Sequence, residues 1–566
     1  MGLALTKEHI VAPPGFNRWR VAAASVSIHL CIGSVYAWSV FNPPLTRVLG
    51  VVAPAADDWT LGSVVWIFSV AIVFLGLSAA LAGKWLERVG PRLVGLVSTI
   101  CWCSGFLIGA AGIHLHQLWL LYLGYGVIGG IGLGLGYVSP VSTLIRWFPD
   151  HRGMSTGLAI MGFGGGAILG APLKTWLLNH FFHAPDYLGT VETLRVVTEQ
   201  GRQFVETAGG RVEVVVATVA QAAELPGGGA AGAYVVGTGS TGAAATFLVL
   251  AAVYLVVMSI AAFSYRVPAA GWLPAGWTPP PESASHGMIS THHVHADEAI
   301  RTSQFWLLWV VLCCNVTAGI GVLGVAKTMM GEIFGSALPA LVTAAFASTY
   351  VLMISVFNMA GRFAWASASD SLGRKNTYTC FFVLGTLLYL SLPWFASMAG
   401  GAGTVWQLWG FYAATLLIFT MYGGGFATIP AYLADLFGTM HVGAIHGRLL
   451  TAWSVAGVLG PLAITHLRER SVLAAVHELV TRIDPAAFRA SFGAPVSQLG
   501  ELVRANTVSI EKLMLLVPPG TPDPSAGIYN STMYAMAALL VVALVANWRI
   551  HPVESFHYVE NARQKG

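Results

Sequence analysis

The stretch PVSTLIRWFPDHRGMSTGLAIMGFGGGAILGAPL, residues 140–173, returns in altered form as PAYLADLFGTMHVGAIHGRLLTAWSVAGVLGPL, residues 430–462. At one constant offset the two stretches share a proline and three glycines, which are Pro140, Gly153, Gly157 and Gly170 in the first and Pro430, Gly443, Gly447 and Gly460 in the second. Two shorter segments, ERVGPR from Glu87 and DSLGRK from Asp370, also align an acid, a glycine and a basic residue. Glycine and proline are abundant here, so single coincidences are expected, but the set of matches predicts an internal duplication.

The composition is that of a polytopic membrane protein. Of 566 residues, 55% are hydrophobic and 10% are charged, and the mean hydropathy is +0.69. A helix needs about 20 apolar residues to cross the hydrocarbon core of a bilayer, and runs of this length recur between charged or Pro/Gly-rich joins. We therefore predict an all-α fold with about twelve transmembrane helices, at about 20–46, 61–83, 93–113, 117–145, 153–179, 243–265, 304–328, 338–366, 377–397, 404–434, 443–466 and 528–548.

The duplication groups these helices into two halves of six, with a substrate site expected between the repeats. We place the N-terminal half at 1–265, a cytoplasmic linker rich in Pro, Trp and His at 266–303, and the C-terminal half at 304–566. Two long outer joins, at about 180–242 and 468–527, occupy equivalent places in the halves. The first is rich in glycine and turn residues and the second shows helical apolar spacing, so we expect either a small cap built by both or long disordered loops.

Lysine and arginine are distributed unevenly among the joins. Most of those near helix ends fall on one side, and the short joins of the other side keep little beyond Arg47 and Lys327. The positive-inside rule then predicts a multi-pass protein of the cell (inner) membrane with both termini cytoplasmic. The net charge of +4 is spread along the chain, which gives no support for a nucleic-acid partner; we expect a monomer in contact with the lipid bilayer and a small solute.

Arg362 is the most unusual charge in the sequence. It lies eight residues before Asp370, or ~12 Å along a helix, and therefore near the middle of the bilayer. A guanidinium there costs at least ~2.5–3.5 kcal/mol on insertion scales, which favours a wet cavity or an anion beside it. Asn358 lies one turn earlier on the same face, and together the two side chains offer a fork of donors to a carboxylate. The alternative is an arginine that snorkels to the interface or pairs with helix carbonyls.

Other polar and aromatic side chains fall at membrane depth. His29 and Tyr36 share a face of the first helix, and a histidine at that depth could couple transport to protons or simply bond a neighbouring helix. Tyr137 precedes Pro140, where the helical hydrogen bonds are interrupted, so its hydroxyl is a candidate donor to substrate. Tyr422 and Trp453 are candidate pocket walls in the second half, with core packing as the alternative for each.

Several functions find no support in the sequence. No P-loop or other enzyme signature is present, so we expect neither an enzyme nor an ATP-driven pump. We expect no cofactor and no metal, and we interpret the segment THHVHADE, with His292, His293 and His295, as a solvated linker. Lys174 and Lys327 lie far along outward-running helices, where snorkelling to the outer surface is the expected behaviour.

The motifs resemble those of a known family. GKWLERVGPR and ASDSLGRK look like the paired loop signature of the major facilitator superfamily, although Glu87 stands where Asp is more usual. GYVSPVSTLIRWFPDHRGMSTGLA, QFWLLWVVLCCNVTAGIG, NMAGRFAWASASDSLGRKN and YGGGFATIPAYLADLFG look like the oxalate:formate antiporter family, relatives of the monocarboxylate transporters. The resemblance covers almost all helices but not the two long outer joins.

This resemblance implies roles for individual residues. It implies that Arg362 binds the substrate carboxylate, that Asn358 lines the same pocket and that Tyr137 contacts substrate. It also implies a cytoplasmic latch formed by acidic and basic residues of the paired loops, which here are Glu87, Arg88, Arg92, Asp370, Arg374 and Lys375. The oxalate:formate exchanger has a lysine in the eleventh helix, within a Thr-Ala-Lys context, whereas this chain reads Thr451, Ala452, Trp453.

The missing lysine bears on the substrate. A dianion in a poorly solvated pocket needs two positive partners, because an unpaired carboxylate costs several kcal/mol. The sequence therefore favours a secondary transporter of a monocarboxylate such as formate, lactate or pyruvate, working by alternating access as an exchanger or a proton symporter. The alternatives are an oxalate or other dicarboxylate antiporter, a carboxylate sensor or receptor on a transporter scaffold, and drug efflux.

Overall fold

The structure of the chain is a computed structural model that describes residues 5–199, 202–207, 210–223, 225–278, 288–290, 292–397, 404–492, 494–504, 508–518 and 520–559. Within these ranges twelve helices are long and apolar enough to cross a membrane, as the apolar runs predicted. The chain divides into two compact units. Unit 1 comprises Met1–Arg301, Pro430–Ser454 and Pro552–Gly566, and unit 2 comprises Thr302–Ile429 and Val455–His551.

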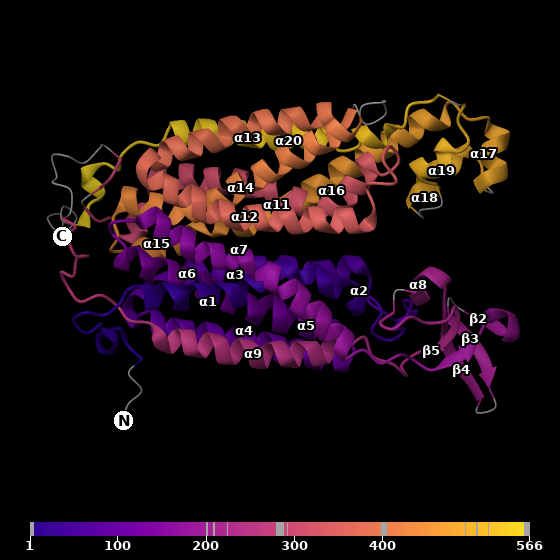
Figure 1. Cartoon of the computed structure of the whole chain (residues 1–566), viewed down its shortest axis with the longest axis horizontal. Coiled ribbons are helices and arrows are strands. Elements are labelled where there is room, and N and C mark those ends of the chain that lie inside the picture. The colour runs from indigo at the N-terminus through magenta and orange to yellow at the C-terminus, as the bar shows by residue number, and fades with distance from the viewer. Residues whose placement is uncertain are drawn as a thin grey trace. The chain divides into compact units, whose positions relative to one another are not determined.

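Unit 1 contains the first six spans, which run side by side in Figure 1. Within it α1 packs against α7, α4 against α9, and α3 against both α6 and α15. Its helices are η1 (Lys7–Ile10), α1 (Trp19–Gly33), η2 (Ser34–Phe41), α2 (Asn42–Leu45), α3 (Leu61–Val89), α4 (Pro91–His114), α5 (Leu118–Leu121), η3 (Tyr122–Gly129), α6 (Gly130–Trp147), α7 (Arg152–His180), η4 (Val191–Thr193), α8 (Val219–Ala223), α9 (Ala243–Ser264), α10 (Ala296–Ala299), α15 (Val442–Leu449) and η9 (Ser555–His557).

The first span changes its winding midway. After Gly33 the helix tightens into the 3₁₀ segment η2, and Ala37 inside it has non-helical dihedrals, φ −92° and ψ 27°. Tightened turns of this kind leave carbonyl oxygens without their usual i+4 partner, so other donors must satisfy them. The first span also lies in close contact with α7 at this point. Gly33 and Gly166 make the contact possible, because a side chain on either would collide with the backbone of the facing helix. The glycine-rich run in α7 therefore serves helix packing.

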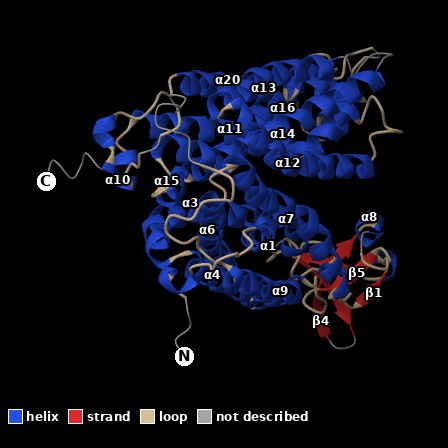
Figure 2. Cartoon of the chain, turned by 60° about the vertical axis from the view of Figure 1, so that its left-hand side comes forward, coloured by secondary structure: helices blue, strands red, loops and turns tan. Residues whose placement is uncertain are grey.

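The first outer join folds into a five-stranded antiparallel sheet. Its strands lie in the order β1-β5-β4-β3-β2, and they are β1 (Tyr187–Gly189), β2 (Val196–Glu199), β3 (Arg202–Thr207), β4 (Gly210–Ala217) and β5 (Gly232–Val235). One face of the sheet, with Val215 and Tyr234, packs on Val52 and Ala53 beyond α2. The sheet lies at the end of unit 1 opposite α15 (Figures 1 and 2). The expectation of disorder is wrong for the described part of this join.

Unit 2 contains the remaining helices. Here α13 and α11 both pack on α20, and α12 packs on α11 and α13. The helices are α11 (Ser303–Phe334), α12 (Ala344–Leu372), α13 (Arg374–Ser397), most of α14 (Thr404–Phe437) and of α16 (Thr451–Val480), α17 (Pro485–Phe492), η7 (Val496–Gln498), α18 (Leu499–Arg504), α19 (Ile510–Met514), η8 (Pro524–Gly527) and α20 (Asn530–Trp548).

Several predicted spans have different bounds, among them the eighth and the eleventh. The eighth begins at Ala344 rather than about 338, because the side chain of Thr343 accepts a hydrogen bond from the backbone N–H of Phe346 and so caps the helix. It ends at Leu372, before Gly373 with φ of 82°. The eleventh continues through α16 to Val480, since buried Val476 and Leu479 extend its apolar face into the second outer join. As its spacing predicted, that join is helical in the residues described.

Candidate functional site

Arg362 is fully buried in α12 of unit 2, with 0% of its surface exposed. Its Nε donates a hydrogen bond to Oδ1 of Asn358 at 3.1 Å, one turn earlier in the helix. Its guanidinium carbon lies 5.4 Å from the centre of the Phe426 ring, within the range of a cation–π contact. The structure therefore brings Arg362 and Asn358 together as the sequence predicted, and it rules out an arginine that snorkels to the surface.

Helix α14 passes very close to this pair. A Cβ on Gly423 would lie 3.0 Å from Cγ of Arg362 and would also strike Asn358, so only glycine allows the approach. Beside it, the ring of Tyr422 meets that of Phe426 at 5.5 Å, nearly perpendicular. Tyr422 is thus placed next to the residue that stacks on the guanidinium, in an aromatic wall within unit 2.

A second group of predicted residues gathers in unit 1. Phe163 of α7 lies at its centre, with its ring 5.2 Å from both Tyr36 and Tyr137 and 5.5 Å from Trp453. Tyr137 and Trp453 are also in contact, at 5.3 Å, and both are completely buried. The sequence analysis identified three of these four rings but missed Phe163, whose position inside the GFGGG run was the available signal.

His29 is buried beside Tyr137 and is held at both ring nitrogens. Its Nδ1 lies 2.5 Å from the carbonyl oxygen of Ala159, and its Nε2 lies 3.1 Å from that of Tyr137. Carbonyl oxygens only accept, and a neutral imidazole donates from one nitrogen only. The ring of His29 therefore links α1 to the backbone of α6 and of α7.

His446 of α15 is a buried histidine that the sequence analysis did not select. It is 1% exposed, its ring lies 5.9 Å from that of Tyr137, and neither ring nitrogen has a hydrogen-bond partner among the described residues. Buried polar groups normally have partners, and exceptions often mark functional positions. His29, Tyr137 and His446 together form a buried polar cluster in unit 1.

Lys174 corrects an expectation. Instead of snorkelling to an outer surface it is fully buried, with its Nζ donating to the carbonyl oxygens of Ser34 at 2.7 Å and Ala37 at 3.4 Å. Its ammonium also lies 4.9 Å from the centre of the Phe41 ring. These carbonyls belong to η2, where the tightened winding leaves acceptors to be satisfied. The lysine therefore stabilises the change of winding in the first span and places a cation inside unit 1. Lys327, in contrast, is exposed.

The predicted latch residues in unit 1 have separate contacts. Glu87, at the end of α3, accepts from the backbone N–H of Ala444 at 3.2 Å and lies 3.1 Å from Nδ1 of His441, at the start of α15. A carboxylate at a helix N-terminus is favourable because of the unpaired N–H groups there. Arg92 is buried and donates to the carbonyl oxygen of Tyr265, which ties α4 to the end of α9. Arg88 is exposed at the same end as Glu87.

Further ion pairs strengthen the same end of unit 1, and the sequence analysis missed them. Asp297 of the linker accepts from Lys84 and from Arg448, both at 2.6 Å, and these two partners hold its pKa at about 2. Asp435, near the end of α14, pairs with Arg152 of α7 at 3.0 Å. The charges concentrated in the two repeated segments indicated that ion pairs could form here. The sequence alone does not show which residues pair with one another.

The remaining latch residues lie in unit 2 and bond within it. Arg374, the first residue of α13, pairs with Asp370 near the end of α12 at 2.7 Å. Lys375 donates to the carbonyl oxygens of Trp548 and Ile550, at 2.9 and 2.7 Å, where the last span ends. Their predicted part in a cytoplasmic latch stays a prediction.

These features define a class. Twelve helices of the described residues are long and apolar enough to cross a membrane, which is typical of a multi-pass membrane protein. Residues 25–189 match the model of the Major Facilitator Superfamily. The solved structure of the proton:xylose symporter XylE, bound to 6-bromo-6-deoxy-D-glucose, has a similar fold, with a TM-score of 0.51 and 13% sequence identity. This similarity covers 97% of this chain and 98% of XylE. The fold is therefore that of the major facilitator transporters, and the first part of the chain matches the model of that superfamily.

Three curated proteins are similar over most of their length. An uncharacterised major facilitator transporter of Escherichia coli, YhjX, is 23% identical over 78% of this chain and 86% of its own. The apicoplast pyruvate carrier 1 of Toxoplasma gondii is 26% identical over 75% of this chain and 78% of its own. The oxalate:formate antiporter of Oxalobacter formigenes is 23% identical over 78% of this chain and 83% of its own.

Proposed function

We propose that this protein is a secondary transporter of a small monocarboxylate, with Arg362 as the anchor of the carboxylate. The observation that carries the proposal is the burial of a permanently charged guanidinium at mid-span, held by an amide oxygen and an aromatic face. An arginine keeps its charge inside proteins, and a buried charge is normally offset by an opposite one. A carboxylate offers two oxygens that match the donor fork of the guanidinium.

In unit 2, Asn358 fixes the orientation of the guanidinium by accepting a hydrogen bond from its Nε. Tyr422 and Phe426 supply an apolar wall suited to the short carbon chain of a lactate- or pyruvate-like acid. The similarity to a pyruvate carrier and to an oxalate:formate antiporter supports a small organic anion as the class of substrate.

In unit 1, we assign Tyr36, Tyr137 and Trp453 to the apolar end of the substrate and His29 to proton coupling. Trp453 replaces the cation expected in this family with a ring packed on Phe163 and Tyr137. One guanidinium then meets one carboxylate, which favours a singly charged substrate. We place both termini and the α15 end of unit 1 on the cytoplasmic side, in agreement with the distribution of lysine and arginine.

A dicarboxylate is the second candidate, and Lys174 is the observation that favours it. Its buried ammonium lies on η2, the segment that also carries Tyr36, so unit 1 contains a cation after all. Its donation to two carbonyl oxygens fits a structural role equally well, and for this reason we rank the monocarboxylate first.

The test is counterflow in liposomes with the purified protein and a panel of labelled acids: formate, lactate, pyruvate, oxalate and malonate. We expect one or more monocarboxylates to exchange and the two dicarboxylates to fail. Exchange of oxalate or malonate at the higher rate would replace the proposal with the second candidate. Saturable binding of an acid without any flux would instead indicate a sensor.

A further inference from the structure

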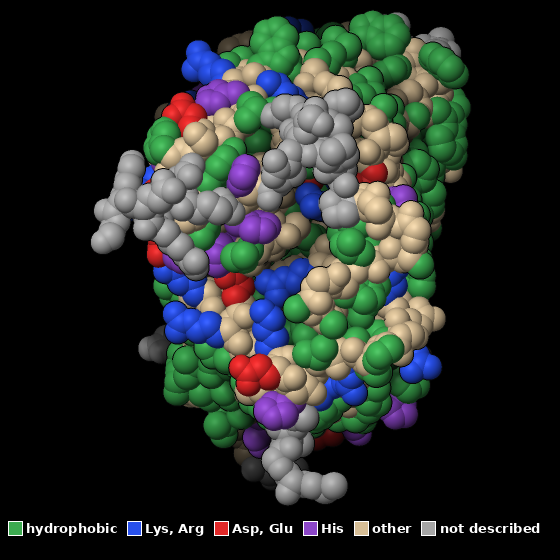
Figure 3. All heavy atoms as spheres, turned by 90° about the vertical axis from the view of Figure 1, so that its left-hand side faces the viewer, with side chains coloured by type: hydrophobic (Ala, Val, Ile, Leu, Met, Phe, Trp, Pro, Cys, Tyr) green, Lys and Arg blue, Asp and Glu red, His purple; other side chains and the backbone are tan. Residues whose placement is uncertain are grey.

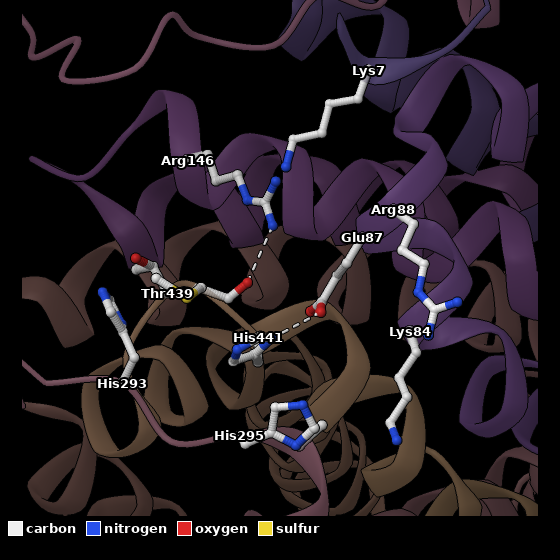
Figure 4. A pocket seen from close by; sticks show the side chains of 11 residues that line it. Lys7, Lys84, Glu87, Arg88, Arg146, His293, His295, Thr439 and His441 are labelled. Atoms are coloured by element: carbon white, nitrogen blue, oxygen red, sulfur yellow. Dashed lines mark hydrogen bonds and ion pairs between the residues drawn. The ribbon is translucent and has the colours of Figure 1, made fainter. Parts of the chain in front are cut away.

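A cavity of about 550 Å³ opens at the α15 end of unit 1, and its lining is dominated by cations. Lys7 comes from η1, Lys84 and Arg88 from α3, and Arg146 from the end of α6, while Glu87 is the single carboxylate of the lining. Figure 4 shows these side chains around the cavity, and Figure 3 shows Lys and Arg side chains gathered on this face with histidines beside them. A pocket with this charge is built for an anion.

Two of the charged side chains of the lining, Glu87 and Lys84, already have partners in the protein. The Glu87 carboxylate is taken up by His441 and by the backbone N–H of Ala444, and Lys84 is paired with Asp297. Lys7, Arg88 and Arg146 remain. None of these three has an ion pair with any carboxylate in the part of the chain that the structure describes, and Arg146 donates only to the carbonyl oxygen of Met440, at 3.3 Å.

Two of the remaining cations lie against one another. Burial lowers the pKa of the Lys7 ammonium, and the positive charge of Arg146 lowers it further, although Glu87 opposes the effect. Lys7 is fixed in place because it packs against Gly90, in the turn between α3 and α4. A like-charged pair held this way costs free energy that an anion bound between the two would recover.

We propose that this cavity binds a phosphate group, carried by a soluble phosphorylated compound or by the headgroup of an anionic phospholipid. A phosphate monoester carries about −1.5 to −2 charges at pH 7 and three acceptor oxygens, which suits a lining with three cations better than one carboxylate does. The phosphodiester of a phospholipid carries one charge on two free oxygens, which fit the fork of a single arginine. Two of the three cations are arginines, whose planar fork suits phosphate oxygens. The volume falls within the ~300–1,000 Å³ typical of small-molecule sites, more than formate or pyruvate fills.

The position of the cavity gives the bound phosphate a consequence. Its wall includes Thr439, Met440 and His441, the join between α14 and α15, opposite the ends of α3 and α6. A bound phosphate would hold this join to α3 and α6 in addition to the Glu87 and Asp297 contacts. Phosphate binding does not depend on which substrate the protein transports. The effect of phosphate on carboxylate flux rests on the proposed function, in which this end of the protein must open for the substrate to reach the cytoplasm.

The experiment compares the full-length parent with Lys7→Gln, Arg88→Gln and Arg146→Gln, and with Arg301→Gln as a control. Arg301 is an exposed linker arginine paired with Glu298, outside the cavity. Thermal unfolding in detergent is followed against inorganic phosphate and pyrophosphate, with sodium chloride at matched ionic strength, and against phosphatidylglycerol compared with phosphatidylcholine. Carboxylate exchange is measured in parallel with and without the stabilising anion on the α15 side.

We expect saturable stabilisation of the parent and the control, with affinity at least ~10-fold weaker in each cavity variant, since each variant removes one charge-assisted hydrogen bond to the anion. Stabilisation by phosphate or pyrophosphate identifies the soluble source, and stabilisation by phosphatidylglycerol alone identifies the lipid. Arg88 is exposed and Lys7 is partly exposed, so their variants keep the test open if Arg146→Gln does not fold. The proposed site would be wrong if the anions stabilised the parent and the cavity variants equally, or if none of the three anions stabilised the parent. If an anion stabilised the parent but did not slow carboxylate exchange, only the regulatory role would be wrong.

Discussion

Asp435 accepts a hydrogen bond from Arg152 at 3.0 Å, and the side chains of both residues are largely shielded from water, at 9% and 20% exposure. The pair joins the last turn of α14 to the first turn of α7 inside unit 1. Its low exposure reduces screening, so the two charges should interact more strongly than a surface pair.

We predict a coupling energy of about 1–3 kcal/mol between Arg152→Gln and Asp435→Asn in a double-mutant cycle. Chemical unfolding in mixed micelles measures it. The matched pair Arg301 and Glu298, where the arginine is 70% exposed, should give about 0–0.5 kcal/mol. Equal coupling in the two cycles would contradict a special role of the Arg152–Asp435 pair.

The network around Asp297 should be insensitive to pH across the physiological range. Because Lys84 and Arg448 hold its pKa at about 2, below the ordinary value, its contribution to folding is present above the unfolded pKa of ~3.9 and is lost as the pH falls through about 2. Asp297→Asn should therefore lower the melting temperature equally at pH 5.5 and pH 7.5. The loss should be small, under ~1 kcal/mol, since the carboxylate is 46% exposed. A loss present only at pH 7.5 would contradict this assignment.

Replacing Trp453 should change the charge selectivity. The ring is fully buried against Tyr137 and Phe163, and Trp453→Lys restores a cation at the position where the family resemblance places one. We expect this variant to gain exchange of oxalate relative to formate, by about tenfold for each 1.4 kcal/mol of added interaction. Trp453→Gln removes the ring without adding charge and should lose monocarboxylate exchange without gaining oxalate. If both variants change the ratio alike, the ring rather than the charge sets selectivity.

The buried histidines predict a second measurement on transport. His446 has both ring nitrogens without a partner among the described residues, and Tyr137 and His29 are the groups placed beside it. We expect His446→Gln and His29→Gln each to flatten the pH dependence of net uptake while exchange at equal pH persists, because exchange needs no proton transfer. His180→Gln, at the exposed end of α7, is the control. An unchanged pH profile in both variants would reject proton coupling by this cluster.

Much of the fold could be predicted from the sequence, for reasons that are local. Apolar runs long enough for a bilayer marked all twelve spans, and the four-residue spacing of Asn358 and Arg362 placed them on one helix face. The sheet at 187–235 was missed because its strands are short and valine-rich among glycines, so that only the alternation in β4, around Val212 and Val214, indicated a strand.

Contacts between distant segments could not be read from the sequence. Lys174 was misjudged because distance along a helix does not reveal the carbonyls freed by the tightened winding of η2. The partners of Asp297, on α3 and α15, are set by how three separate segments meet. His446 was missed for the same reason, since its sequence context is that of an ordinary residue of a membrane helix.

The most direct test of the central claim is counterflow of a transported monocarboxylate with Arg362→Ala and Arg362→Lys, measured against Arg482→Ala. Arg482 is an exposed arginine paired with Glu478, so its variant loses one charge away from the buried pair. We predict that Arg362→Ala abolishes counterflow, that Arg362→Lys keeps a small fraction of it because one point charge replaces a fork, and that Arg482→Ala transports like the parent. Parental counterflow by a correctly folded Arg362→Ala would contradict the assignment of Arg362 as the carboxylate anchor.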